Sequence, residues 1–196
     1  MTDLLREALA RFEEVFARAG ETESSEPTAV ILATADGEGR PSARTVLLKG
    51  VDERGFVFYT NSRSRKGRDL RENPRAALAF FWQTVFEQVL VEGAVEPVSE
   101  AESDAYWATR RRESCLGAWA SDQSAPLASR EELNARYAEH ERRFAGADVP
   151  RPPHWRGYRI VPERIEFWRP GDHRLNDREC YERTEEGGWR RFLLNP

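Results

Sequence analysis

The feature of this sequence that most restricts its fold is a series of short, strand-prone segments separated by turn residues. Residues 28–35 and 42–48 are apolar and partly β-branched and flank Asp36-Gly37-Glu38-Gly39, so they predict a β-hairpin. Three further strands are expected at 56–60, 76–82 and 88–95, with a short helical insert after the first of them. Five strands at this spacing favour an antiparallel sheet or barrel.

Helices are expected around these strands. Residues 1–20 carry apolar side chains at helical spacing and end at Gly20, which predicts an amphipathic N-terminal helix. Ser99 to Glu102 and Ser129 to Glu132 both fit the capping box, in which a hydroxyl and a carboxylate each satisfy a free backbone amide, so two helices should begin there. Strands return at 157–160, 165–168, 180–183 and 189–194. We therefore predict an α+β protein with a sheet-rich core, in one domain over residues 1–196.

Composition excludes several classes of protein. The chain of 196 residues is 39% hydrophobic, enough for a core of its own, and its net charge of −4 provides no basic field for nucleic acid or an anionic membrane. Cys115 and Cys180 form no CxxC pair, and three scattered histidines show no zinc spacing, so no metal is expected. No stretch approaches the roughly 18 apolar residues of a membrane span, and a cytoplasmic location is expected.

The loop from Asn61 to Lys66 is the first candidate site. It leaves a strand and enters a helix, with Ser64 as a candidate N-cap and two cations in the first turn. Cations there oppose the helix dipole, and a bound phosphate would resolve the conflict. Arg44 and Lys49 on the preceding hairpin could add to such an anion cradle. The alternative is a solvated basic loop whose charges contact only water.

Two more segments combine polar groups. Tyr106, Arg110 and Ser114 are spaced by four, which suits a phosphate grip, although the arginines at 110–112 could instead be a basic helix C-terminus favoured by the dipole. Residues 168–178 contain a tryptophan, a turn at Pro170-Gly171 and two arginines; they form either a site or an exposed hairpin.

Several blocks together resemble one family, the pyridoxine/pyridoxamine 5′-phosphate oxidases. The matching blocks are Arg44-Thr45-Val46-Leu47-Leu48-Lys49, Gly55 to Asn61, Ser64-Arg65-Lys66, Glu87-Gln88-Val89, Gly117-Ala118-Trp119, Gln123-Ser124, Ile165-Glu166-Phe167-Trp168, His173-Arg174-Leu175 and Asp177-Arg178. Their order and spacing agree from about Thr28 to Pro196, and such an ordered series is more specific than any single motif.

The resemblance implies an FMN-binding split β-barrel that forms a homodimer with FMN at the subunit interface. The implied flavin contacts are Arg44, Thr45, Val46, Leu47, Leu48, Lys49, Tyr59, Thr60, Arg65, Lys66, Gln88, Gln123, Ser124, Trp168 and Arg178. The implied contacts to a phosphorylated substrate are Lys49, Tyr106, Arg110 and Ser114, with Arg174 and Asn176 at the reacting end as the catalytic pair. The implied reaction moves a hydride from the substrate to FMN, which dioxygen then reoxidises to give hydrogen peroxide.

Three features depart from the family pattern. Asn176 stands where the family usually has histidine, which replaces a titratable ring with an amide. The chain begins almost at its first helix, so a lid over the substrate is expected to be absent or to come from elsewhere. The usual Arg-Leu-x-Pro ending is here Leu193-Leu194-Asn195-Pro196, which removes one cation.

These departures leave three functional hypotheses. The first is oxidation of pyridoxine or pyridoxamine 5′-phosphate to pyridoxal 5′-phosphate, which the phosphate grip at Tyr106, Arg110 and Ser114 favours. The second is oxidation of another substrate on the same scaffold, as in phenazine biosynthesis. The third is a flavin- or pyridoxal-phosphate-binding protein without turnover.

Overall fold

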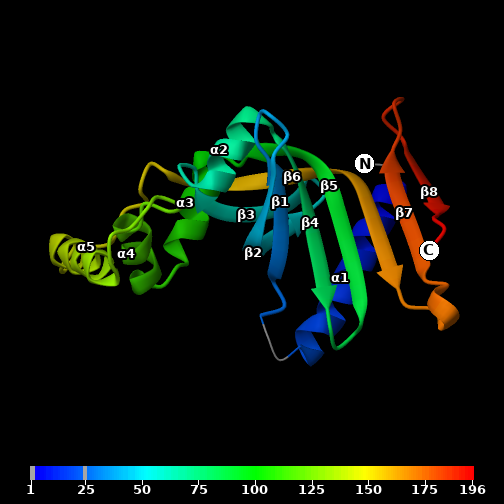
Figure 1. The fold of residues 1–196 in the computed structure, drawn as a ribbon, viewed down its shortest axis with the longest axis horizontal. Helices are drawn as coiled ribbons and strands as arrows, with labels where there is room; N and C mark the ends of the chain where they lie inside the picture. The colour runs from blue at the N-terminus through cyan, green and yellow to red at the C-terminus, as the bar shows by residue number, and fades with distance from the viewer. Residues whose placement is uncertain (1–2, 24–25) are drawn as a thin grey trace.

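The computed structural model describes residues 3–23 and 26–196, and at its centre lies a closed antiparallel barrel (Figure 1). The barrel strands are β1 (Ala29–Ala35), β2 (Pro41–Asp52), β3 (Gly55–Asn61), β4 (Arg75–Trp82), β5 (Glu87–Pro97) and β6 (Trp155–Arg169). They follow one another around the barrel in the order β3-β2-β1-β4-β5-β6, and pairing of β3 with β6 closes it. The predicted antiparallel barrel with flanking helices is therefore confirmed.

Helix α1 (Asp3–Thr22) packs against the barrel and completes its core. The apolar stripe predicted from the sequence is buried, and Phe12 contacts Phe56 and Phe80 edge-on at centroid distances of 5.0 and 5.1 Å. Burying large aromatic side chains in this way contributes strongly to stability. The predicted helix at 1–20 is confirmed from residue 3 onward; residues 1 and 2 of that prediction lie outside the described residues.

Strand β6 is one continuous strand, whereas the sequence predicted two, at 157–160 and 165–168. Pro162 and its neighbours resemble a turn in the sequence. In the structure Pro162 pairs with Gly93 next to a bulge, a position at which proline is tolerated within a sheet. A Cβ on Gly93 would lie 1.9 Å from the carbonyl oxygen of Val161, so the close approach of β5 and β6 at this point requires glycine.

The second half of β6 stays paired with β5, and its other edge pairs with β7 (Asp177–Arg183) instead of β3; β7 pairs in turn with β8 (Trp189–Leu193). A single 3₁₀ turn, η1 (Asp172–Arg174), connects β6 to β7. In Figure 1 these last elements stand at one end of the molecule, beyond α1.

The helices between β5 and β6 form a lobe at the other end (Figure 1), where Trp107, Leu116 and Trp155 share a small apolar cluster. The lobe consists of α3 (Glu100–Ala108), α4 (Arg112–Ala120) and α5 (Arg130–Arg143). The capping box at Ser99 is formed in full, and Ser129 caps α5 as predicted. Helix α4 was not predicted.

The remaining helix, α2 (Arg65–Glu72), is the predicted insert between β3 and β4. None of the helices in the described residues is long and apolar enough to cross a membrane.

Candidate functional site

The loop before α2 has the geometry that the sequence predicts. Ser64 is the N-cap of α2, and its hydroxyl accepts from the backbone N–H of Gly67 at 3.4 Å. A Cβ on Gly67 would lie 2.4 Å from the carbonyl oxygen of Ser62, so the loop folds tightly over the first helical turn. Arg65 is exposed, whereas Lys66 is buried.

The side chain of Lys66 reaches from α2 to β3 and to the loop before α5. Its Nζ donates to Oε1 of Gln123 at 2.9 Å and to Oγ1 of Thr60 at 3.2 Å. Burial, reinforced by the nearby charge of Arg44, lowers the pKa of Lys66 from 10.5 to about 8. A desolvated cation whose two best partners are neutral oxygens is a favourable place for an anion.

Arg44 is held in place by a buried carboxylate. Its Nη1 donates to Oγ1 of Thr34 at 2.7 Å, and its Nη2 lies 3.5 Å from Oδ2 of Asp69. That carboxylate also accepts from Thr34 at 2.6 Å and from Ser42 at 3.0 Å. Although burial raises the pKa of Asp69, these bonds and Arg44 hold it below its usual value, so Asp69 stays ionised.

Strand alternation divides the predicted flavin contacts on β2. Arg44, Val46 and Leu48 point inward, whereas Thr45, Leu47 and Lys49 are exposed on the outer face. A single ligand cannot meet all six side chains from one side, so part of this set would have to act through backbone groups.

Arg110 lies in the turn between α3, which ends at Ala108, and α4, which begins at Arg112. The interpretation of residues 110–112 as a basic helix C-terminus is therefore wrong. The Arg110 guanidinium carbon lies 4.8 Å from the ring centroid of Trp155 and 5.1 Å from that of Trp107. Its Nη2 donates to the carbonyl oxygen of Ser114 at 3.0 Å. Two indoles and a carbonyl thus orient this cation.

Tyr106 stacks on Tyr59 at a centroid distance of 4.2 Å, and Tyr59 stacks on Trp155 at 5.0 Å. Burial raises the pKa of both tyrosines, so both remain neutral donors near neutral pH. This aromatic stack forms the wall between two adjoining cavities.

Two cavities bring eight of the predicted residues together, while the others, including Arg44 and Lys66, line neither cavity. One, of about 390 Å³, is lined by Tyr59, Thr60, Asn61, Arg110, Ser114, Gly117, Ala118, Ser121, Gln123 and Trp155. The other, of about 600 Å³, is lined by Glu26, Leu47, Lys49, Tyr59, Tyr106, Arg110, Arg111 and Ser114. Arg110 and Ser114 line both, and the predicted grouping of Tyr106, Arg110 and Ser114 in space is found.

A second group of predicted residues lies on β5, β6 and β7. Trp168 pairs in register with Gln88 on one side and with Arg178 on the other, so the three form a row across the sheet. The Nε of Arg178 donates to Oε1 of Glu166 at 2.8 Å.

The loop after β6 holds Arg174 in an uncommon conformation. His173 and Arg174 both have positive φ, 56° and 66°. Asn176 closes the loop, because its Oδ1 accepts from the backbone N–H of Gly171 at 3.2 Å. A Cβ on Gly171 would lie 2.0 Å from the carbonyl oxygen of Leu175. In this structure Asn176 therefore acts within the loop, and Arg174 stays exposed.

The two groups stand at opposite ends of one chain. The cavities adjoin α3 and α4, whereas η1 and the strand pair β7–β8 lie at the far end in Figure 1. Ser124 is exposed on the cavity side, with a positive φ of 70°. A single site that used both groups would need a second copy of the chain.

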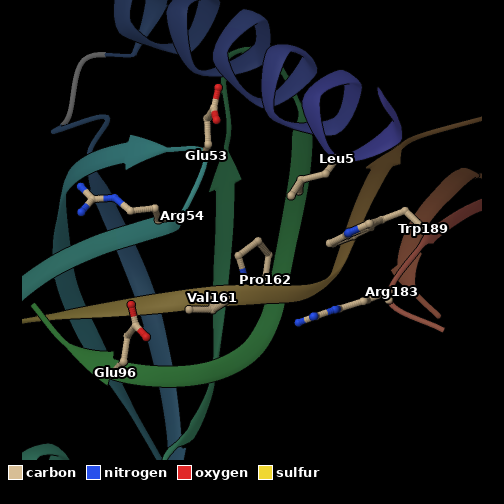
Figure 2. Close-up of a pocket in the computed structure, with 9 residues that line it drawn as sticks. Leu5, Glu53, Arg54, Glu96, Val161, Pro162, Arg183 and Trp189 are labelled. Carbon is tan, nitrogen blue, oxygen red and sulfur yellow. The ribbon is translucent and has the colours of Figure 1, made fainter. Parts of the chain in front are cut away.

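Another groove, of about 560 Å³, lies between α1, the β2–β3 turn and the β7–β8 hairpin (Figure 2). Its walls combine Leu5 and Trp189 with charged side chains such as Glu53 and Arg183. It contains none of the predicted site residues.

Two residues that support the candidate site were missed from the sequence. Trp155 lines a cavity and supports both Tyr59 and Arg110, and Asp69 fixes Arg44. Trp155 follows a proline-rich loop without a motif, and Asp69 resembles any exposed helix carboxylate in sequence, so no local signal identified them.

Comparison with protein families gives two matches that together cover most of the chain. Residues 17–169 match the family model described as pyridoxamine 5′-phosphate oxidase. Residues 155–196 match the model of the pyridoxine 5′-phosphate oxidase C-terminal dimerisation region.

Curated relatives agree over nearly their full length. The pyridoxine/pyridoxamine 5′-phosphate oxidase of Myxococcus xanthus (strain DK1622) is 58% identical over 188 residues, which is 96% of this chain and 91% of the relative. The protein of the same name from Alkalilimnicola ehrlichii is 59% identical over 195 residues, covering 98% of this chain and 99% of the relative.

Among solved structures, PhzG from Burkholderia lata 383, in complex with tetrahydrophenazine-1-carboxylic acid, superposes with a TM-score of 0.90 at 36% identity, covering 96% of this chain and 92% of that one. A pyridoxamine 5′-phosphate oxidase-related, FMN binding protein from Nostoc punctiforme has a TM-score of 0.74 at 18% identity over 95% of this chain and 96% of that one, a likeness of fold alone.

Proposed function

The chain belongs to the pyridoxamine 5′-phosphate oxidase family, and on that premise we propose that it is an FMN-dependent oxidase of pyridoxine or pyridoxamine 5′-phosphate. The observation that carries the proposal is the buried Lys66, whose Nζ has only neutral oxygens at hydrogen-bond distance among the described residues, two of them on the cavity-lining residues Thr60 and Gln123. The relatives that are 58% and 59% identical carry the name of this activity.

The residues present fit the phosphate end of FMN. Lys66, Arg44 and the exposed Arg65 supply cations, and Ser64 begins the helix whose N-terminus adds free amides. The buried Asp69 keeps Arg44 ionised and oriented before any ligand arrives. Gln123 and Thr60 line the cavity and accept from the Lys66 ammonium, and a bound phosphate would replace their neutral oxygens with full charge.

Substrate phosphate is assigned to the neighbouring cavity. Arg110, clamped between two indoles, supplies a rigid guanidinium, and Lys49 adds a second cation at the rim. Tyr106 donates a neutral phenol hydrogen bond, and Ser114 lines the same wall.

When bound, FMN would accept a hydride from the carbon bearing the substrate's amine or alcohol, and dioxygen would reoxidise the reduced flavin and be reduced to hydrogen peroxide. The protein contributes position and electrostatics. Trp168 offers an aromatic face and Arg178 a cation beside it, while Arg174 stands exposed above the loop that Asn176 closes.

A homodimer is part of this proposal. The outer face of β1, β2 and β4 exposes Ile31 at 43%, Leu47 at 40% and Phe81 at 49%, an apolar surface suited to burial against a second copy. The match of residues 155–196 to a dimerisation region supports it. A dimer would bring Arg174 and Arg178 of one subunit to the cavities of the other and give two FMN sites at the interface.

One observation favours a second candidate function. PhzG, at 36% identity and a TM-score of 0.90, was solved with tetrahydrophenazine-1-carboxylic acid, so the same scaffold accepts a reduced tricyclic acid. The replacement of the family histidine by Asn176 falls at the reacting end of the proposed substrate site. Oxidation of a dihydro-aromatic acid is therefore the alternative to test.

The test starts with the visible spectrum of the purified protein before and after addition of FMN. Flavin bands that persist through gel filtration, and peroxide release with pyridoxine or pyridoxamine 5′-phosphate, are the expected results. Bound flavin with peroxide only from a dihydrophenazine acid would move the assignment to the second candidate. No flavin binding at all would refute both oxidase proposals.

A further inference from the structure

Glu166, in the middle of β6, is a buried carboxylate shared by two arginines. Its side chain is 2% exposed. Oε1 accepts from Nε of Arg178 at 2.8 Å and lies 2.8 Å from its Nη2, and Oε2 accepts from Nη2 of Arg164 at 2.7 Å. Both carboxylate oxygens are therefore engaged in charge-assisted hydrogen bonds.

The sheet places this carboxylate directly beside the row of proposed flavin contacts. Glu166 lies two residues before Trp168, so both side chains stand on the same face of β6. Trp168 pairs with Arg178, and Glu166 pairs with Leu90 on one side and with Cys180 on the other. Apolar neighbours in register keep water from the carboxylate.

Arg164 anchors the carboxylate from the side away from Trp168. Its Nη1 donates to Oε1 of Glu92 at 2.8 Å, and its Nε donates to Sγ of the buried Cys180 at 3.1 Å. The four side chains Glu92, Arg164, Glu166 and Arg178 thus form a chain of alternating charge that runs from a half-exposed glutamate to the proposed flavin contact.

The Arg178 side chain is held in place but keeps free hydrogen-bond donors. Its Nη1 donates once to the carbonyl oxygen of Asn195 at 3.1 Å, while the side chain remains 32% exposed. A guanidinium has five N–H donors, so donors remain for a ligand after the bonds to Glu166 and Asn195 are made. Because Glu166 restrains one edge of the Arg178 guanidinium, the other edge keeps a fixed direction in which it can contact a ligand.

We propose that Glu166 is a positioning residue that pre-orients Arg178 for FMN, with Arg164 holding Glu166 in turn. The inference rests on the proposed flavin site. It adds to that site a carboxylate that would not touch the cofactor and whose effect would pass through Arg178.

The test compares FMN dissociation constants, from quenching of flavin fluorescence, for Glu166→Gln, Arg178→Met and the double variant. Each single change is expected to weaken binding by about tenfold or more, the scale of one charged hydrogen bond. Both single changes abolish the same contact, that of an oriented Arg178 guanidinium with FMN. The double variant should therefore bind FMN about as tightly as the single variant with the lower affinity. The visible bands of bound flavin should shift alike in the two single variants.

Glu92→Gln is the matched control, because it neutralises the other carboxylate on Arg164 and leaves the bonds between Glu166 and Arg178 intact. It is expected to bind FMN within about twofold of the unchanged protein. Additive losses in the double variant, or a Glu166→Gln protein that binds FMN as tightly as the unchanged protein, would overturn the positioning role.

A measurement on the unchanged protein keeps the inference testable if Glu166→Gln does not fold. In the flavin-free full chain, the Nε–H of Arg178 should be as rigid by ¹⁵N relaxation as that of the buried Arg159, and much more rigid than that of the exposed Arg6. An Arg178 as mobile as Arg6 would contradict pre-orientation. Failure of the unchanged protein to bind FMN would instead refute the proposed function, and the relaxation result would still decide whether Glu166 orients Arg178.

Discussion

Replacing Lys66 with methionine should leave the flavin-free protein at least as stable as before and weaken its binding of FMN. The side chain is 7% exposed, and burial lowers the pKa of Lys66 from 10.5 to about 8. Each pKa unit corresponds to about 1.4 kcal/mol, so folding with a charged Lys66 at neutral pH costs about 3 kcal/mol. Methionine removes that cost and keeps most of the side-chain volume.

The change also removes the hydrogen bonds that Lys66 donates to Thr60 and Gln123. Leaving such acceptors without that donor costs about 1–3 kcal/mol, although the Thr60 hydroxyl can still donate to Gln123 at 3.1 Å. The flavin-free variant should therefore be as stable as the unchanged protein or more stable by up to about 2 kcal/mol. FMN binding should fall by roughly tenfold to a hundredfold, because one charged hydrogen bond to phosphate is lost.

The same residue sets the expected pH dependence. Lys66 binds its proton less tightly in the folded chain, so the unfolded chain carries more protons between pH 8 and 10.5, and the stability of the flavin-free protein should rise with pH across that window. FMN affinity should fall as the pH rises through about 8, because the ammonium loses its proton. Both trends should disappear in the methionine variant.

Urea denaturation of the flavin-free chain and fluorescence titration with FMN, each at several pH values, measure these effects. Arg68→Met is the matched control, since Arg68 is an exposed cation on the same helix that donates to the carbonyl oxygen of Arg63 at 2.6 Å. A methionine variant that loses 2 kcal/mol of stability or more, or one that binds FMN within about twofold of the unchanged protein, would refute the reasoning.

Three further changes test other parts of the site. Trp155→Leu should raise KM for the phosphorylated substrate by about three- to thirtyfold, because Arg110 loses a cation–π contact. Trp155→Phe should retain much of that contact and show a smaller rise in steady-state kinetics. Equal KM values for the two variants would argue against the role of Trp155 in orienting Arg110. Gly171→Ala should lower kcat with little change in global stability, because the added Cβ would meet a backbone carbonyl oxygen at 2.0 Å and displace the loop that carries Arg174. Phe81→Glu should shift the protein from dimer to monomer in sedimentation experiments and release FMN, since Phe81 is exposed on the proposed interface; a stable flavin-bound dimer would place the interface elsewhere.

Most of the fold could be predicted because local signals and the final structure agree. The hairpin of β1 and β2 has apolar, partly β-branched segments around a glycine-containing turn. Its strands end within a residue or two of the predicted ends, apart from β2, which runs on to Asp52. The capping boxes marked the starts of α3 and α5 for the same reason.

The predictions of secondary structure failed where contacts between distant segments determine the structure. Helix α4 has no side-chain N-cap bond at Arg111 and is stabilised by packing of Cys115 and Leu116 against Trp107 and Trp155, which are distant in sequence or lie on another helix. Pro162 could enter β6 only because Gly93 on the partner strand permits a bulge. Neither compensation can be recognised from the segment itself.

The cations of the proposed site differ in how the fold supports them, and the sequence does not show that difference. Arg44 and Arg178 each contact a buried carboxylate, Asp69 and Glu166, that lies on another element. Lys66 has no carboxylate within hydrogen-bond distance among the described residues, and its pKa is the one that falls to about 8. The two arginines should therefore contribute fixed geometry at any pH near neutrality, while the phosphate of FMN would supply the missing counter-charge of Lys66. It follows that the fall of flavin binding above neutral pH should reside in Lys66, and that removing Glu166 should weaken binding without shifting its pH midpoint. Removing Asp69 should weaken binding and also move the midpoint to lower pH, because the charge of Asp69 raises the pKa of Lys66.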